Sequence, residues 1–221
     1  KTALAESLLL MTGAIDRMGR AADGNTVCDY DQEEIKRQIS LSTAIAPLEY
    51  KGCRINLLDT PGAFDFAGEV MEALRAADAA IIVCSAKDGV SVGLEKAWKY
   101  CEERNMPRFI YISKTDEDNS DYQACLDALK GKFGQSVVPI VAPVIDGNKK
   151  VTGIVDLLHN TAYEVKGGKA AACAIPADMA DEVEALRAEL MEAAAGSDEE
   201  LMEKFFDTME LSAEDMARGL K

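Results

Sequence analysis

The sequence predicts an α/β fold built on a doubly wound, mostly parallel sheet that carries an inserted α+β subdomain. Strand-like and helix-like patterns alternate through the middle of the chain. Residues 79–85 and 108–112 are continuously apolar, which is typical of parallel strands buried on both faces, and residues 136–141 are expected to form a third strand. Helical stretches near 91–105 and 121–133 separate these runs, and this βαβαβ rhythm indicates a doubly wound sheet.

The part of the chain before this alternation is expected to contain a helix, a long loop and a hairpin. Residues 3–11 have a strongly helical composition, whereas residues 13–40 are polar and loop-rich. A loop of this length inside a compact domain is usually functional or mobile. Two apolar runs follow at 41–50 and 53–58, and their separation by two residues is that of a tight β-hairpin.

We predict a boundary between a main domain at residues 1–142 and an inserted subdomain at residues 143–221. Within the subdomain, residues 143–168 form short extended pieces, with a turn at Gly167-Gly168. Residues 178–221 are helical and acidic, but too short and irregular for the sustained heptads of a coiled coil. A helical segment appended to the sheet is therefore the preferred interpretation.

The composition is strongly acidic. The chain has 221 residues, of which 48% are hydrophobic, enough for one domain with a subdomain. It carries 39 acidic and 24 basic residues, for a net charge of −15. Such a surface repels phosphate backbones, so we expect no direct nucleic-acid binding by this chain. The charge suits a basic protein partner, or it serves only solubility.

Cysteine and histidine usage restricts the environment and the chemistry. The six cysteines are scattered without a C-x-x-C pair, which is typical of buried thiols in a reducing cytoplasm. His159 is the only histidine, so the chain cannot supply a two-histidine metal site, and we expect His159 to be structural. No apolar run approaches the ~20 residues of a membrane span, so no membrane association is predicted.

An acidic turn follows the predicted hairpin. Residues 59–62 read Asp-Thr-Pro-Gly, directly after the strand-like run 54–58 and ahead of the helical pattern 69–74. An acid at a strand end lies at the sheet edge where open α/β sheets bind ligands. The acid can hold Mg²⁺ through water, and the glycine N–H can approach a terminal phosphate. Taken alone, this motif is more often a turn than a phosphate sensor.

The chain opens with Lys1-Thr2 at the start of its first helical stretch. This pair matches the end of the phosphate-binding loop G-x-x-x-x-G-K-[ST], which would make the sheet of the P-loop NTPase type. We expect the glycines of that loop and the strand before them to lie upstream, and the last strand of the sheet to lie beyond Lys221. We therefore expect these 221 residues alone to bind nucleotide poorly.

A third motif, Ser-Lys-Thr-Asp at residues 113–116, follows the second buried strand. A carboxylate there can accept hydrogen bonds from both N1–H and the exocyclic amine of guanine, while a lysine stem packs along the ring. Adenine lacks this pair of donors. All three motifs are predicted at one sheet edge, and the ordered set is far more specific than any single motif.

In combination, these motifs resemble the GTP-binding domain of bacterial elongation factor G, the ribosomal translocase, and its close relatives. The similarity extends along essentially the whole chain and includes residues 12–15, 29–37, 54–62, 65–66, 69–70, 88–90 and 153–163. The last of these stretches is similar to the start of the inserted subdomain that separates this family from the smaller tRNA-carrier GTPases. Residues 85–90 are also similar to the tetracycline-resistance ribosomal protection proteins, a sister group.

The resemblance implies a role for each motif residue. Lys1 would contact the β- and γ-phosphates of GTP. Thr2 would ligate Mg²⁺, joined by Ser40 at the position of the family's switch threonine, and Asp59 would hold the ion through water. The full set implied to contact the nucleotide is Lys1, Thr2, Asp59, Thr60, Pro61, Gly62, Ala63, Ser113, Lys114, Thr115 and Asp116. In that set the Gly62 N–H would sense the γ-phosphate, and Lys114 and Asp116 would hold guanine.

Three positions depart from the family pattern. Ala63 stands where the family has the histidine that positions the attacking water, so no catalytic residue is intact. Losing one positioned group of this kind typically costs ~10²–10⁴-fold in rate. Ser113 replaces an asparagine that ties the nucleotide loops together, and Gln38 replaces a glycine before the switch. We therefore predict a protein that binds GTP and hydrolyses it slowly.

The sequence predicts a cytoplasmic translational GTPase that acts on the ribosome, with GTP or GDP and Mg²⁺ as ligands. One alternative is a non-enzymatic ribosome-binding module that has lost productive nucleotide use, and another is a tetracycline-resistance-type ribosomal protection GTPase. A metabolic P-loop ATPase is disfavoured by residues 114–116. The family's inserted subdomain contacts the acidic-tipped stalk of the large ribosomal subunit, and the acidic subdomain here weakens the expectation of that contact.

Overall fold

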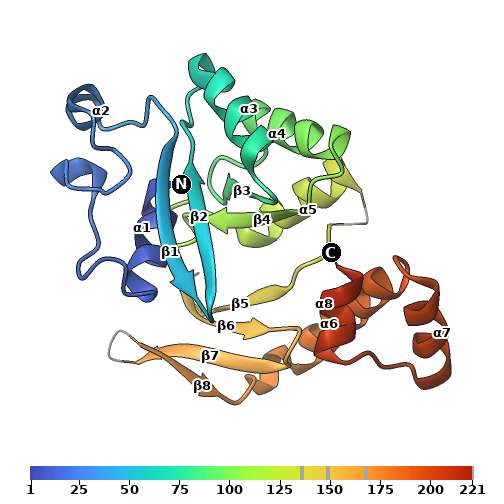
Figure 1. Cartoon of the computed structure of the whole chain (residues 1–221). Helices are drawn as coiled ribbons and strands as arrows, with labels where there is room; N and C mark the ends of the chain where they lie inside the picture. Colours follow the sequence, from blue (N-terminus) through green and yellow to red (C-terminus); the bar gives the residue numbers. More distant parts are fainter. Residues whose placement is uncertain (135–136, 148–149, 167–168, 221) are drawn as a thin grey trace. The chain divides into compact units, whose positions relative to one another are not determined.

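The computed structural model describes residues 1–134, 137–147, 150–166 and 169–220 (Figure 1). The chain divides into two compact units, which are described separately below. The first unit comprises Lys1–Cys84 and Ser91–Tyr111, and the second comprises Ser85–Val90 and Ile112–Lys221. Within the described ranges, none of the helices combines the length and apolarity needed to cross a membrane.

The first unit begins with helix α1 (Thr2–Met11), as the composition of residues 3–11 predicts. The predicted loop at 13–40 is not entirely irregular, because it contains the short helices η1 (Ala21–Asp23) and α2 (Gln32–Arg37). Helix α2 begins with a capping box. The Asp31 side chain accepts a hydrogen bond from the Glu34 backbone N–H, and the Glu34 side chain accepts one from the Asp31 backbone N–H. The sequence pattern D-x-x-E explains why a helix forms inside this polar stretch.

The predicted hairpin is confirmed. Strands β1 (Ala44–Tyr50) and β2 (Cys53–Asp59) pair antiparallel, and Tyr50 lies opposite Cys53. The turn residues Lys51 and Gly52 have φ values of 48° and 78°, the left-handed pair that a two-residue turn requires. Helix α1 lies alongside this hairpin (Figure 1). Their shared core consists of Ala5, Leu9, Cys28, Ala44, Ala46 and Leu48.

The alternation of helices and strands through the middle of the chain is also confirmed. The elements in order are η2 (Phe64–Phe66), α3 (Ala67–Ala76), β3 (Ala80–Ser85), α4 (Val92–Glu103), β4 (Arg108–Ser113) and α5 (Tyr122–Phe133). The prediction that these strands are buried on both faces is wrong. Ile81 is 50% exposed, Phe109 is 51% exposed and Tyr111 is 45% exposed. An apolar run identifies a strand but does not specify which of its faces is covered.

The described strands form three sheets rather than the single, mostly parallel sheet that the sequence predicts: β1-β2, β3-β4 and β5-β6-β7-β8. The third sheet consists of β5 (Val141–Ile145), β6 (Val151–Asp156), β7 (Thr161–Lys166) and β8 (Lys169–Cys173), and it is antiparallel throughout. Short connections explain this pairing, because parallel neighbours need a long crossover. The strand predicted at 136–141 begins instead at Val141, and both Ser136 and the Gly167-Gly168 turn lie outside the described residues.

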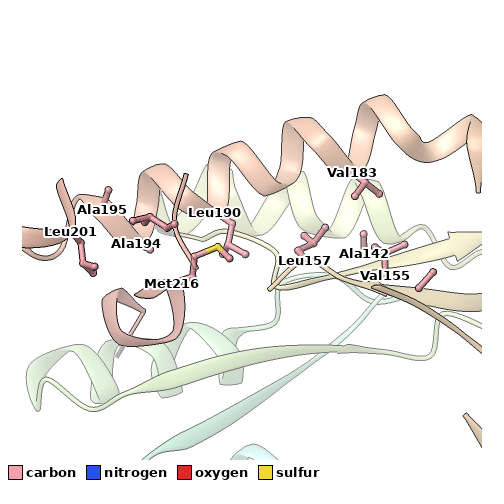
Figure 2. Close-up of a cluster of buried hydrophobic side chains, with 11 residues drawn as sticks. Ala142, Val155, Leu157, Val183, Leu190, Ala194, Ala195, Leu201 and Met216 are labelled. Carbon is pink, nitrogen blue, oxygen red and sulfur yellow. The ribbon is translucent and has the colours of Figure 1, made fainter. Parts of the chain in front are cut away.

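Three helices complete the second unit: α6 (Ala180–Ala195), α7 (Glu199–Thr208) and α8 (Ala213–Gly219), preceded by η3 (Ala177–Met179). Side chains of Asp198 and Ser212 cap the N-termini of α7 and α8. Figure 2 shows the core between this helical layer and the sheet. Four of its side chains are completely buried: Leu157, Leu190, Leu201 and Met216. Burial of apolar surface therefore stabilises the helical layer.

Candidate functional site

Two of the three predicted motifs meet in the first unit. The hydroxyl of Thr2, the first residue of α1, donates to Asp59 Oδ2 at 2.7 Å, at the end of β2. The hydroxyl oxygens of Thr2 and Ser40 lie 3.3 Å apart, and the Ser40 hydroxyl donates to Asp29 Oδ1 at 2.6 Å. Two hydroxyls and two carboxylates thus form a continuous group, called here the oxygen cluster (Thr2, Asp29, Ser40 and Asp59).

The carboxylates of the oxygen cluster are buried. Asp29 is 5% exposed and Asp59 is 7% exposed. Burial raises the pKa of Asp59, while the hydrogen bond from Thr2 and the nearby Lys1 ammonium oppose that rise. Burial of an anion is unfavourable unless positive charge or donors compensate for it. The oxygen cluster is therefore a place where a bound cation would be stabilised.

The donor set of the oxygen cluster fits Mg²⁺. This ion prefers hard oxygen ligands and usually keeps several of its own waters, so it needs only a few protein groups. Thr2 and Ser40 offer hydroxyl oxygens on one side, and Asp59 offers a carboxylate bonded to Thr2. Across the described part of the chain, no three His, Cys, Asp or Glu residues are grouped so that they could hold a metal ion. An ion at the oxygen cluster would therefore depend on the hydroxyls and on water as well as on carboxylate.

Lys1 lies beside the turn at residues 59–62. Its Nζ donates to the Pro61 carbonyl at 2.6 Å and lies 3.4 Å from Thr60 Oγ1. A Cβ atom added to Gly62 would lie 3.5 Å from Lys1 Cε and 3.7 Å from Nζ, so the ammonium lies next to the bare glycine backbone. Burial lowers the pKa of Lys1, and Asp59 opposes this shift. The structure thus brings together the predicted phosphate ligand and the predicted γ-phosphate sensor.

Ala63 directly follows this turn and is the residue before η2. It is exposed, and its methyl group has neither a donor nor an acceptor with which to orient water. The next residue, Phe64, is 60% exposed, and the Lys96 Nζ lies 4.1 Å from the centre of its ring. The site therefore has charge and hydroxyl groups for binding, but Ala63 offers no group for proton transfer.

A buried glutamate fastens the loop that leads to Asp29. Glu6 of α1 is completely buried, and its two carboxylate oxygens accept from the backbone N–H groups of Gly19 at 2.8 Å and Val27 at 2.6 Å. A Cβ atom on Gly19 would lie 2.7 Å from Thr26 Cα, so the backbone at Gly19 approaches the backbone at Thr26 too closely for any other residue. These contacts fix the position of Asp29 two residues later.

Cys28 is a buried thiol beside the oxygen cluster. Burial, together with the neighbouring carboxylates of Asp59, Glu6 and Asp29, raises its pKa to about 12. A thiol with this pKa stays protonated at neutral pH and is a poor nucleophile. Cys28 thus acts as a small core residue. Cys84, Cys101 and Cys125 are also buried, as expected, whereas Cys53 is exposed.

The third predicted motif lies in the second unit. Ser113 ends β4, and its carbonyl accepts from the Ala86 N–H at 2.8 Å. Lys114 has a left-handed φ of 58°, and its Nζ lies 3.8 Å from Asp88 Oδ2 and 3.9 Å from Glu117 Oε1. The Thr115 carbonyl accepts from the Ser120 hydroxyl at 3.0 Å, which closes the turn. Asp116 is exposed in this turn, where a ligand could reach its carboxylate.

Three residues of the site have no predicted role in the sequence: Asp29, Glu6 and Glu34. All three are buried carboxylates on or next to the long polar loop. Only Glu34 has a recognisable signal, the capping-box spacing from Asp31. Glu6 accepts from backbone groups in a distant part of the loop. Asp29 has a local partner in Thr26, but its hydrogen bond from Ser40 comes from beyond α2, so the local pattern does not indicate its place in the site.

The comparisons with known proteins show the class to which this site belongs. The model of the elongation factor Tu GTP-binding domain family matches residues 1–215. This match covers nearly the whole chain, so the chain belongs to that family of GTP-binding domains.

Individual relatives point to one branch of the family. The chain is 37% identical over 207 residues to an elongation factor G-like protein of Mycobacterium tuberculosis, covering 93% of this chain and 28% of that protein. It is 33% identical to elongation factor G of Mycoplasma pneumoniae, covering all of this chain and 32% of that protein. A crystal structure of a Thermus thermophilus protein matches 99% of this chain and 33% of its own, with 38% identity and a TM-score of 0.91. The chain spans about a third of the length of these relatives.

Proposed function

We propose that this chain is the nucleotide-binding region of a ribosome-acting, elongation factor G-like GTPase that uses GTP as a conformational switch and hydrolyses it slowly. The observation that carries the proposal is the convergence of Thr2, Ser40 and Asp59, which are up to 57 residues apart in sequence. A structural turn at 59–62 would not need a hydroxyl from each of two distant segments. The similarity to elongation factor G and an elongation factor G-like protein supports the same proposal.

Each residue of the site has a defined task in this proposal. Lys1 would bind the β- and γ-phosphates, Thr2 and Ser40 would provide hydroxyl oxygens for Mg²⁺, and Asp59 would hold that ion through water. Mg²⁺, when bound, would neutralise charge on the phosphate oxygens. The Gly62 N–H binds the γ-phosphate, which its lack of a side chain permits. The remaining contacts come from the backbone at Thr60, Pro61, Ala63, Ser113 and Thr115, and from Lys114 and Asp116 on guanine.

The switch in this proposal is the segment between Gly19 and Ser42. Ser40 would bind Mg²⁺, and the Gly62 N–H would bind the γ-phosphate, only in the GTP state. Loss of the γ-phosphate would therefore leave Ser40 with only its protein contacts to Asp29 and Thr2. Glu6 keeps the start of the segment attached to α1 in both states, because its bonds to Gly19 and Val27 involve no ligand.

Hydrolysis is slow in this proposal because Ala63 cannot orient the attacking water. Charge stabilisation by Lys1 and the oxygen cluster remains, so the residual rate comes from binding and electrostatics alone. The exposed Phe64 beside Ala63 adds bulk but no donor or acceptor.

Residues 143–221 form the inserted subdomain in this proposal, and residues 1–142 form the GTP-binding domain. An apolar core of its own between β5–β8 and α6–α8 supports an independent role for the C-terminal part. The ribosome is the proposed partner, and the net charge of −15 argues that protein surfaces, rather than RNA, contact this region.

Equilibrium titration of the full-length protein with a fluorescent GTP analogue tests the proposal. Binding should depend on Mg²⁺, and GDP should displace the analogue while millimolar ATP should not. Absence of binding at millimolar GTP would contradict the proposal and favour the non-enzymatic ribosome-binding module. A preference for ATP would favour the metabolic ATPase instead.

A further inference from the structure

Glu34 is a buried carboxylate whose hydrogen bonds all go to the backbone around Ser40 and α2. It is 3% exposed. Its Oε1 accepts from the N–H groups of Leu41 at 2.8 Å and Ser42 at 3.1 Å, and its Oε2 accepts from the Asp31 N–H at 3.3 Å. One side chain therefore joins the start of α2 to the two residues that follow Ser40.

These bonds close a loop around Ser40. Asp31 lies nine residues before Ser40, and Leu41 and Ser42 directly follow it, so Glu34 sets the path of the backbone on both sides. On that path the Ser40 hydroxyl reaches Asp29 at 2.6 Å and Thr2 at 3.3 Å. A shift of about 1 Å at Leu41 would break at least one of these contacts, because a hydrogen bond weakens steeply beyond its normal length.

Helix α2 cannot supply this order alone. It has six residues, whereas isolated helices shorter than ~12–15 residues are marginal in water. Hydrogen bonds to a charged acceptor are roughly twice as strong as neutral ones, and burial excludes the water that would compete for Glu34. Glu34 thus provides a buried, charge-assisted link between α2 and the chain after Ser40.

We infer that Glu34 is a positioning residue for Ser40, which holds the Ser40 hydroxyl at the oxygen cluster so that Mg²⁺·GTP is bound more tightly than GDP. This inference rests on the proposed function. Glu34 itself touches neither ligand in this assignment, because its oxygens are occupied by the three backbone donors.

Glu33 provides a matched control in the same helix. It is the neighbouring glutamate in the first turn of α2, its side chain is 53% exposed, and it pairs with Arg37 at 3.1 Å. Exposed pairs of this kind contribute little to stability. Replacing Glu33 by Gln changes the charge of α2 by the same amount as replacing Glu34 by Gln, without touching the segment around Ser40.

The test is a double-mutant cycle on the full-length protein, with the affinities for a fluorescent GTP analogue and a fluorescent GDP analogue measured in Mg²⁺. We expect Glu34→Gln to weaken the binding of the GTP analogue about tenfold, the size of one lost charge-assisted hydrogen bond. The affinity for the GDP analogue should change less than about twofold, since Ser40 is assigned no contact in that state. Glu33→Gln should leave both affinities unchanged.

The cycle with Ser40→Ala separates positioning from general stability. Because Glu34 acts through Ser40, the Glu34→Gln/Ser40→Ala double variant should bind the GTP analogue no more weakly than Ser40→Ala alone. Effects that multiply, or equal losses for both analogues, would overturn the inference. If Glu34→Gln does not fold, the same cycle is run with Glu34→Asp, which keeps the charge and shortens the reach. A wild-type protein that binds no GTP would refute the proposed function, whereas wild-type binding that Glu34→Gln leaves unaltered would refute only the positioning role.

Discussion

The oxygen cluster of the first unit and the helical core of the second unit are stabilised in opposite ways. In the oxygen cluster, buried Asp29 and Asp59 face hydroxyls, and the nearby loop is held by carboxylates that accept from backbone N–H groups. In the helical core, Leu157, Leu190 and Met216 belong to one cluster of buried apolar side chains (Figure 2). One region gathers unfavourable buried charge, and the other removes apolar surface from water.

This difference indicates where the molecule can respond to a ligand. A buried apolar core has one close-packed arrangement and gains nothing from an added ion. A buried group of carboxylates and hydroxyls is incompletely compensated by itself, so a cation or phosphate changes its energy strongly. Substitutions in the helical core should therefore cost stability and leave binding intact, while substitutions in the oxygen cluster should do the reverse.

The largest effect is expected from Leu190→Ala in the helical core. Leu190 is completely buried, so its truncation should lower the free energy of local opening by about 3 kcal/mol through lost burial and a cavity. Hydrogen exchange of α6–α8 peptides in the full-length protein measures this change. GTP affinity should stay within about twofold of wild type at a temperature where the variant is folded. A large loss of affinity with unchanged exchange would contradict the division of roles.

The converse substitution is Asp59→Asn in the oxygen cluster. It should weaken Mg²⁺-dependent GTP binding by about 10- to 100-fold, because a charged acceptor is lost at the ion. It should not destabilise the nucleotide-free protein, and we expect stability to be unchanged or raised by up to about 1 kcal/mol, since burial disfavours the charged form of Asp59. Asp65→Asn, an exposed acid in η2, is the control. Lower stability with normal GTP binding would show that Asp59 is only structural.

GTP affinity measured over a series of pH values, for wild type and for Asp59→Asn, sharpens this result. Burial raises the pKa of Asp59 above its usual 3.8, so the folded state holds this proton more tightly than the unfolded state does. The Asp59 contribution therefore favours folding at acidic pH and is lost as the pH rises through the raised pKa. Mg²⁺ competes with the proton, so GTP affinity should fall about tenfold per pH unit below that pKa. The fall should begin above pH 3.8 and be absent in Asp59→Asn; the same fall in both would assign it to another group.

The smallest effect is expected from Arg218→Ala on the outside of the second unit. Arg218 pairs with Glu200 at 3.1 Å and Asp198 at 3.6 Å, and its side chain is 46% exposed. Exposed pairs contribute ~0–1 kcal/mol, so exchange of the α7 peptides should change by less than about 0.5 kcal/mol. A loss comparable to that of Leu190→Ala would mean that the helices depend on surface charge rather than on the core.

The sequence predicted the two regions unequally. The hairpin and the alternating helices and strands follow from local patterns. The ordered motifs predict that Lys1 and Thr2 meet the turn at residues 59–62, and only the resemblance to elongation factor G adds Ser40. Local patterns involve residues that are close together in sequence, so they can be recognised without knowledge of the tertiary fold. The GTP-binding family, predicted from the same motifs, is confirmed by the family match.

The features that could not be predicted depend on contacts that span the chain. Glu6 binds Gly19 and Val27, and Asp29 binds Ser40, but a lone carboxylate in sequence does not reveal its acceptor role. The exposure of Ile81 and Phe109 was also missed, because an apolar run does not indicate what covers each face. The antiparallel pairing of β5–β8 depends on the lengths of the connections between these strands, which a pattern of short extended pieces does not define.

Single-turnover GTP hydrolysis by the full-length protein on ribosomes, comparing wild type with Ala63→His, tests whether the site binds GTP well but hydrolyses it slowly. We expect slow phosphate release from wild type despite tight GTP binding, and a gain of about 10²-fold or more when an imidazole is introduced beside Gly62. Gly68→Ala, in α3 with no atom near its added Cβ, controls for substitution close to this segment. A wild-type rate equal to that of an ordinary ribosomal translocase, or no gain from Ala63→His, would show that Ala63 does not limit hydrolysis.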